Sequence, residues 1–143
     1  MDGVATVAPS RPVARAPVAY RRILVPVSGG EAAVRIACTL AAEHGAIVTA
    51  LAVIEVPAAL PLDAHMPEQE LEARKTLAAA EAVGDGRGVR VARRTVRARL
   101  AAEAIVDAAE DEELIVLHRP LDKIARYVLQ HARCRVLLST PRA

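Results

Sequence analysis

From Arg22 onward, short apolar runs alternate with longer stretches whose apolar residues recur at helical spacing. A run of four to eight apolar residues has the length of a strand buried on both faces. Strands are expected at 23–27, 47–56, 89–96, 114–117 and 135–139, with helices between them at 31–44, 68–83, 101–112 and 121–132. This alternation predicts an α/β fold, a five-stranded parallel sheet with helices on both faces.

Glycine, proline and arginine residues mark the boundaries of these elements. Gly45 stands where the helix over 31–44 needs a left-handed residue at its end. Three prolines within 57–67 predict an extended loop, and Gly84 is expected to end the helix over 68–83. Arg93 and Arg94 interrupt the third strand, which we therefore place at an edge of the sheet.

The composition restricts the class of partner. The chain has two Tyr, no Phe and no Trp, so it lacks the aromatic faces on which single-stranded nucleic acid stacks. Its formal net charge is only +2. Six arginines lie in 87–99 and six acids in 103–113, and we expect these blocks to pair with each other or with solvent. No nucleic-acid partner is therefore predicted.

Neither the ends of the chain nor its cysteine and histidine residues predict a further domain or a metal site. We expect residues 1–20 to be a flexible arm or linker, 21–140 the folded domain and 141–143 a tail. No apolar run is long enough to insert into a bilayer. Cys38 and Cys134 are far apart and the four histidines are scattered, so no metal site is predicted. A cytoplasmic location with reduced thiols is expected.

The turn after the first strand is one candidate site, because ligands of open parallel sheets bind beyond the carboxyl ends of the strands. Ser28 and Gly29 precede a helix whose N-terminus could cradle an anion. Alternatively, Ser28 and Glu31 form a capping box that satisfies the helix itself. Ser28-Gly29-Gly30 also suggests an ATP pyrophosphatase loop of the S-G-G-x-D-S type. The Asp and second Ser of that loop are missing here, which disfavours an ATP-using enzyme.

Several segments resemble the universal stress protein family. They are YRRILVPV from Tyr20, AAEHGA from Ala41, VTALAVIEVP from Val48 and YVLQHARCRVLLS from Tyr127. The resemblance covers 20–139 and looks closest to the stress-protein-like domains of amino-acid permeases. It implies a Rossmann-like sheet of the adenine nucleotide alpha hydrolase type, with strand order 3-2-1-4-5.

The same resemblance implies a reduced nucleotide site. Nucleotide-binding members carry an Asp after the first strand, where this chain has Ser28, and a G-x-x-G-x9-G-[ST] loop after the fourth strand. The outer glycines of that loop align with His118 and Asp122, so about nine residues of the phosphate-wrapping loop are absent. We therefore expect weak or absent ATP binding. A retained site for ATP or AMP would comprise Pro26, Ser28, Gly29, Val53, His118, Arg119 and Lys123.

The preferred interpretation is a non-enzymatic regulatory or interaction domain without a cofactor. Members of the resembled family pair through their last strands, which implies a homodimer here through Arg135, Val136, Leu137, Leu138 and Ser139. A transporter is the other partner that the resemblance suggests. The alternative is an adenine-nucleotide sensor with a reduced pocket, and an ATP-using enzyme is the third interpretation.

Overall fold

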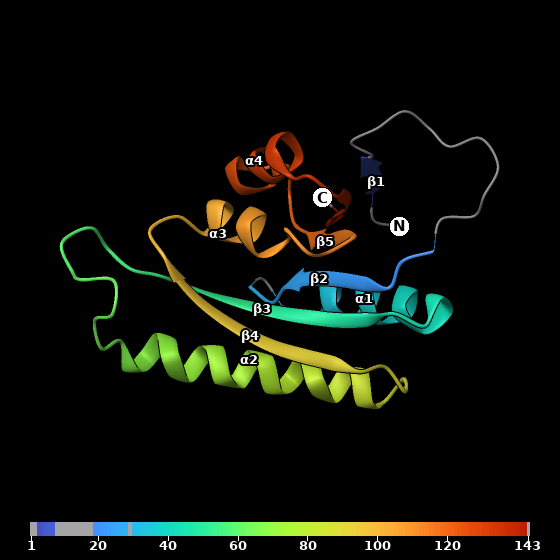
Figure 1. Ribbon diagram of the computed structural model, residues 1–143, viewed down its shortest axis with the longest axis horizontal. Helices are drawn as coiled ribbons and strands as arrows, with labels where there is room; N and C mark the ends of the chain where they lie inside the picture. Colours follow the sequence, from blue (N-terminus) through green and yellow to red (C-terminus); the bar gives the residue numbers. More distant parts are fainter. Residues whose placement is uncertain (1–2, 8–18, 29, 143) are drawn as a thin grey trace.

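The structure, a computed structural model, describes residues 3–7, 19–28 and 30–142 (Figure 1). Its parallel strands are β2 (Arg22–Pro26), β3 (Ile47–Glu55), β4 (Val91–Ala98), β5 (Leu114–His118) and β6 (Arg135–Thr140). Its helices are α1 (Ala32–His44), α2 (Pro67–Asp85), α3 (Ala101–Ala108) and α4 (Lys123–His131). The parallel strands lie in the order β4-β3-β2-β5-β6, which confirms the predicted order 3-2-1-4-5.

Two helices cover each face of the sheet (Figure 1). Side chains of a strand point alternately to opposite faces, so the central strand β2 serves both cores. Ile23 and Val25 pack in the cluster that includes α1 and α2 residues, and Leu24 packs in the cluster that includes α3 and α4 residues. The continuous apolar run of β2 is therefore the consequence of burial on both sides.

A sixth strand, β1 (Gly3–Val7), pairs antiparallel with β6 and forms that edge of the sheet. The prediction of a flexible arm over 1–20 was wrong for these five residues, while residues 1–2 and 8–18 lie outside the described part. The predicted strand order also implied an open sheet edge at Val136–Leu138, but β1 covers that edge of β6. An open strand edge exposes unpaired N–H and C=O groups, which a nearby extended segment can satisfy.

Helix α2 runs through the glycine that was expected to end it. It begins with Pro67, which suits the first helical position, and continues to Asp85. Gly84 is buried in the last turn, where an added Cβ would overlap the side chain of Val91 on β4. The glycine permits a close approach of helix and strand instead of breaking the helix.

The two ends of α1 differ in how well the sequence predicts them. Gly45 adopts φ 67°, and its N–H donates to the carbonyl of Ala41, which confirms the predicted C-cap. The predicted capping box of Ser28 and Glu31 is wrong, because Glu31 itself is the N-cap residue and its side chain makes no capping bond. Glu31 pairs instead with Arg35, one helical turn later.

Strand β4 is the other edge of the sheet and exposes Arg93 and Arg94, as predicted. Its arginines do not pair with the acids of 103–113. Arg93 bonds Glu81 and Arg97 bonds Glu70, both on α2. Of the two predicted alternatives, pairing between the charge blocks is therefore not seen for the arginines of β4, because α2 packs beside β4 within reach of their side chains, while Arg93 and Arg94 are exposed to solvent.

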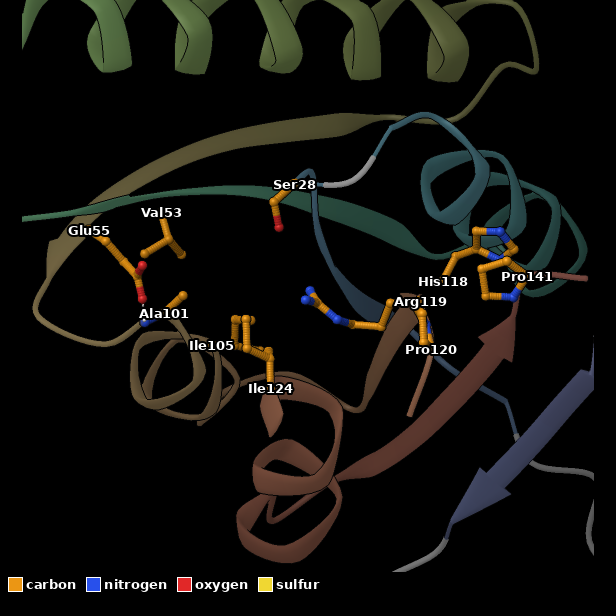
Figure 2. Close-up of a pocket in the computed structure, with 10 residues that line it drawn as sticks. All are labelled: Ser28, Val53, Glu55, Ala101, Ile105, His118, Arg119, Pro120, Ile124 and Pro141. Atoms are coloured by element: carbon orange, nitrogen blue, oxygen red, sulfur yellow. Dashed lines mark hydrogen bonds between the residues drawn. The ribbon is translucent and has the colours of Figure 1, made fainter. Parts of the chain in front are cut away.

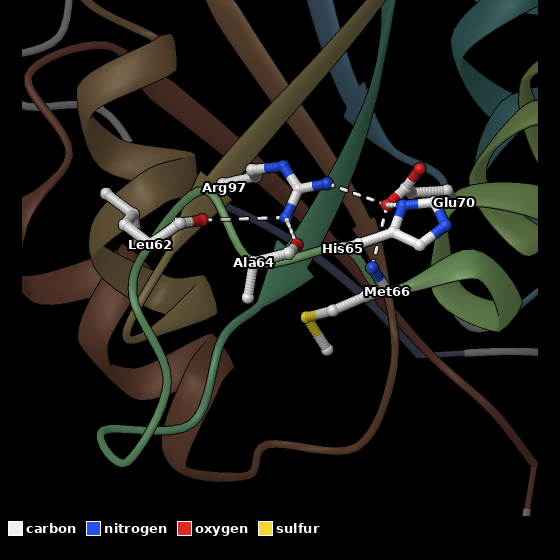
Figure 3. Close-up of polar contacts among 6 residues, drawn as sticks. All are labelled: Leu62, Ala64, His65, Met66, Glu70 and Arg97. Carbon is white, nitrogen blue, oxygen red and sulfur yellow. Dashed lines mark hydrogen bonds and ion pairs between the residues drawn. The ribbon is translucent and has the colours of Figure 1, made fainter.

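Arg97 also holds the proline-rich loop between β3 and α2. Its guanidinium donates to the carbonyl oxygens of Ala64 at 2.7 Å and Leu62 at 3.5 Å, and to the Glu70 carboxylate at 2.9 Å (Figure 3). Glu70 also accepts the N–H of Met66 at the start of α2. A single half-buried cation thus fixes the loop to both the sheet and the helix.

Candidate functional site

A cavity of about 570 Å³ lies beyond the carboxyl ends of β2, β3 and β5 (Figure 2). This is the position at which open parallel sheets bind ligands, since the strand order reverses between β2 and β5. The helices α3 and α4 complete its wall. The residues that line it are Ser28, Val53, Glu55, Ala101, Ile105, His118, Arg119, Pro120, Ile124 and Pro141.

The guanidinium of Arg119 extends into this cavity (Figure 2) and is held there by Asp122. Three hydrogen bonds of 2.8, 3.1 and 3.2 Å join the two side chains. Asp122 is also the N-cap of α4, where its carboxylate accepts the N–H of Ala125 at 2.9 Å. The carboxylate therefore occupies the position at which a helix N-terminus binds an external anion.

The electrostatics of the cavity follow from this pair. The hydrogen bond from Arg119 lowers the pKa of the Asp122 carboxyl, partial burial opposes that shift, and the N–H of Ala125 adds to it. Asp122 is therefore ionised at neutral pH and compensates the charge of Arg119. A second carboxylate, that of Glu55, lines the cavity and accepts the N–H of Ala101 at the start of α3 at 2.7 Å.

The groups that resemble catalytic residues are not arranged for nucleophilic attack. The ring nitrogen Nδ1 of His118 lies 3.0 Å from the Ser139 hydroxyl, but Ser139 is only 1% exposed, so no substrate reaches its oxygen. Burial raises the pKa of the Cys38 thiol and of the half-buried Cys134 thiol, which keeps both protonated. Within the described residues, neither thiol is activated.

A second cavity of about 520 Å³ lies on the α2 side of the same strand ends. Ser28, Val53 and Glu55 line both cavities, which makes the end of β3 a partition between them. The second cavity adds Gln69, Glu72 and Thr76 from α2. It contains no cationic side chain among its lining residues.

The structure brings together four of the residues predicted for a retained nucleotide site, namely Ser28, Val53, His118 and Arg119. Pro26 is buried at the end of β2 and lines neither cavity, and Lys123 is exposed at the first position of α4. Gly29 lies outside the described residues.

Several lining residues were missed by the sequence interpretation. Glu55 ends a strand, so the rule of strand carboxyl ends would have found it. Asp122 precedes the apolar stripe of α4 and carries the residue type of an N-cap, which is also a sequence signal. Pro141, assigned to a tail, lines the cavity only because β6 ends beside it.

No group of three or more metal-binding side chains occurs within 3–7, 19–28 and 30–142. Over the same residues, none of the helices combines the length and apolar character that a membrane span requires.

Comparison with known proteins places the chain in a family. The model of the universal stress protein family matches residues 19–139, which is most of the sequence. The chain belongs to the universal stress protein family. A search of curated proteins found no match.

Solved universal stress proteins share this fold. One from Archaeoglobus fulgidus aligns with a TM-score of 0.72 at 21% identity, over 84% of this chain and 98% of that chain. One from Burkholderia pseudomallei aligns with a TM-score of 0.68 at 29% identity, over 83% and 95%. A universal stress protein from Archaeoglobus fulgidus in complex with dAMP aligns with a TM-score of 0.71 at 22% identity, over 85% of this chain and 99% of that chain.

Proposed function

We propose that this universal stress protein domain is a non-enzymatic regulatory or interaction module in which ATP binding is weak or absent. The observation that carries the proposal is the ion pair of Arg119 and Asp122 at the N-terminus of α4. A phosphate group placed there would meet a carboxylate instead of free N–H donors, and like charges repel strongly at such distances.

The length of the connection between β5 and α4 supports the same proposal. Residues 119–122 alone link the two elements, and the N–H of Asp122 donates to the carbonyl of Pro120 in a tight turn. Wrapping a triphosphate requires several consecutive N–H groups directed at the ligand. This turn directs the N–H of Arg119 at the Ser139 carbonyl instead, so it offers no such cradle.

An adenine-nucleotide sensor is the second candidate function, because a cavity of about 570 Å³ remains beside Ser28 and Val53. That volume lies in the range of small-molecule sites. Other members of the family were solved with dAMP and cAMP. In this chain such a ligand would have to share Arg119 with Asp122, whose carboxylate repels the phosphate.

An ATP-using enzyme is the third candidate and gains the least support. It would need an activated nucleophile or a general base that reaches the substrate. Ser139 is buried, and the raised pKa of Cys38 and Cys134 disfavours their thiolates.

Titration calorimetry of the full chain with ATP, AMP and cyclic AMP tests this proposal. We expect no saturable heat with ATP up to a dissociation constant of about 100 μM, which corresponds to roughly −5.5 kcal/mol. Saturable ATP binding tighter than that value would overturn the proposal. Binding of AMP or cyclic AMP alone would favour the sensor, and turnover of ATP that is lost in Ser28→Ala would favour the enzyme.

We also propose that the protein self-associates through Arg135–Ser139. We further propose a cytoplasmic location, in which the thiols of Cys38 and Cys134 remain reduced. A transporter remains the second class of partner that we propose. In the structure, β1 covers the outer edge of β6, so the strand of a partner can pair there only after β1 has detached.

A further inference from the structure

Strand β1 occupies an edge of the sheet that is suited to a second copy of this chain. It runs antiparallel to β6, with Gly3 opposite Thr140, Ala5 opposite Leu138 and Val7 opposite Val136. Two copies related by a two-fold axis would bring their β6 strands together antiparallel as well. β1 therefore takes the direction and position that a partner's last strand would take.

The edge of β6 is rigid, which makes it a good template for pairing. Val136 and Leu138 are buried in the core that α3 and α4 cover, and Leu137 packs against the opposite core. Parallel pairing with β5 fixes the inner edge along Leu114–His118. Since both faces and the inner edge of β6 are packed, only the N–H and C=O groups of its outer edge remain to pair with another strand.

Strand β1, in contrast, is weakly held. Among the described elements, β6 is the one that β1 contacts extensively, and β1 contributes five residues that include a glycine. β1 lies at the border of the molecule (Figure 1). A glycine in a strand loses much backbone entropy on ordering, and the hydrogen bonds of a single edge barely offset the entropy of ordering five residues. The closed strand is therefore in equilibrium with an open one.

The sequence of β6 favours a second copy over an unrelated strand. An antiparallel pair centred on Leu138 would place Arg135 of each copy opposite Pro141, because the paired numbers then sum to 276. The two arginines thus avoid each other, and the prolines, which lack N–H groups, fall at the ends of the ladder. In this register Leu138 lies opposite its own copy, Leu137 opposite Ser139 and Val136 opposite Thr140, so no two charged residues face each other at the centre of the ladder.

We propose that β1 is an intramolecular strand that covers β6 and suppresses dimerisation, and that a second copy's β6 replaces it. This inference rests on the homodimer of the proposed function and adds its regulation. Any event that removes β1 from the sheet edge, such as cleavage or binding of the N-terminal segment elsewhere, would then release the dimerising surface.

Sedimentation velocity of the wild-type chain, a proline variant and a valine control, each from about 1 to 300 μM, tests the inference. In Ala5→Pro/Thr6→Pro, one of the two prolines removes an N–H that faces β6, because successive N–H groups of a strand point to opposite sides. The control Ala5→Val/Thr6→Val keeps both N–H groups. We expect the proline variant to dimerise at least about tenfold more tightly than the other two proteins.

Hydrogen exchange of the β6 amides, measured at the lowest concentration, verifies that the proline variant has lost its cover without unfolding. Equal dimerisation of all three proteins would overturn the inference and leave the homodimer intact. Absence of a dimer in every protein, with faster β6 exchange in the proline variant, would remove both the inference and the homodimer. Neither result bears on ATP binding, which calorimetry decides separately.

Discussion

Replacing Gly84 by alanine should destabilise the protein, although the same change stabilises most helices. Alanine is favoured over glycine in a helix interior by about 1 kcal/mol. At Gly84, however, the added Cβ would overlap Cγ2 of Val91 and lie 2.8 Å from the carbonyl oxygen of Val89. Real Cβ atoms do not approach other atoms so closely, so the helix or β4 must shift.

The size of the effect follows from how freely these neighbours can move. The Val91 side chain can adopt another rotamer, but the Val89 carbonyl belongs to a turn that its own N–H pins to the Gly84 carbonyl at 2.9 Å. Overpacking of this kind costs about 1–3 kcal/mol, from which the helical preference of alanine subtracts about 1 kcal/mol. Because the Val89 carbonyl cannot move aside, we take the upper part of that range, about 2–3 kcal/mol, which leaves a net loss of about 1–2 kcal/mol. This loss corresponds to a decrease of about 2–8 °C in Tm.

Gly86→Ala is the matched control, two residues further along the chain. Its Cβ would lie 3.6 Å from the carbonyl oxygens of Ala82 and Val83, an ordinary contact, and its φ of −65° is helical. Thermal and urea unfolding should show Gly86→Ala unchanged or more stable. A Tm of Gly84→Ala equal to or above that of Gly86→Ala would refute the packing argument. In a double-mutant cycle, Val91→Ala should partly rescue Gly84→Ala.

Three further outcomes are expected. A lysine at position 97 lacks the planar fork that reaches Leu62, Ala64 and Glu70 together. In Arg97→Lys, amide exchange in 57–66 should therefore accelerate, while the free energy of unfolding falls by only about 1–2 kcal/mol. Arg119 lowers the pKa of Asp122 in the folded protein, so on acidification this carboxyl binds a proton in the unfolded chain before it does so in the folded one. Tm should therefore fall as the pH drops below about 4. The fall should be smaller in Asp122→Asn. Cys38 is fully buried whereas Cys134 is partly exposed, so a thiol reagent at neutral pH should modify Cys134 first and Cys38 only on unfolding.

The parallel sheet could be predicted because each of its strands and helices carries its own periodic pattern. β1 could not be predicted in this way. Its five residues, Gly3–Val7, begin with a glycine and precede a stretch rich in proline and arginine, so they do not stand out as a strand. They become a strand because β6 offers an unpaired edge. Pairing with β6, and not the residue pattern of Gly3–Val7, therefore determines that this segment is a strand.

Glycine and acidic residues show a similar limit at single positions. Gly84 and Gly45 look alike in the sequence, yet one lies inside a helix and the other ends one, since only Gly84 faces a neighbouring strand at close range. Glu31 was assigned to a capping box but bonds Arg35, a competing partner one turn away.

The candidate site was predictable where it depends on topology. Ser28, Val53, His118 and Arg119 were found from strand ends and family resemblance, and they line one cavity. Its chemical character was not predictable, because it depends on a side-chain contact. That Asp122 both caps α4 and neutralises Arg119 becomes visible only once the short turn closes.

Side-by-side calorimetry of ATP with the wild-type protein and Asp122→Asn tests the central claim most directly. Asparagine is as good an N-cap as aspartate but carries no charge, so the variant keeps α4 and leaves Arg119 uncompensated. Asp111→Asn, an exposed acid at the opposite end of β5, is the control.

We predict that the wild type and Asp111→Asn bind ATP more weakly than about 100 μM and that Asp122→Asn binds it at least about tenfold more tightly than they do. Tight binding by the wild type, or equally weak binding by all three proteins, would contradict the claim that the internal carboxylate replaces the phosphate.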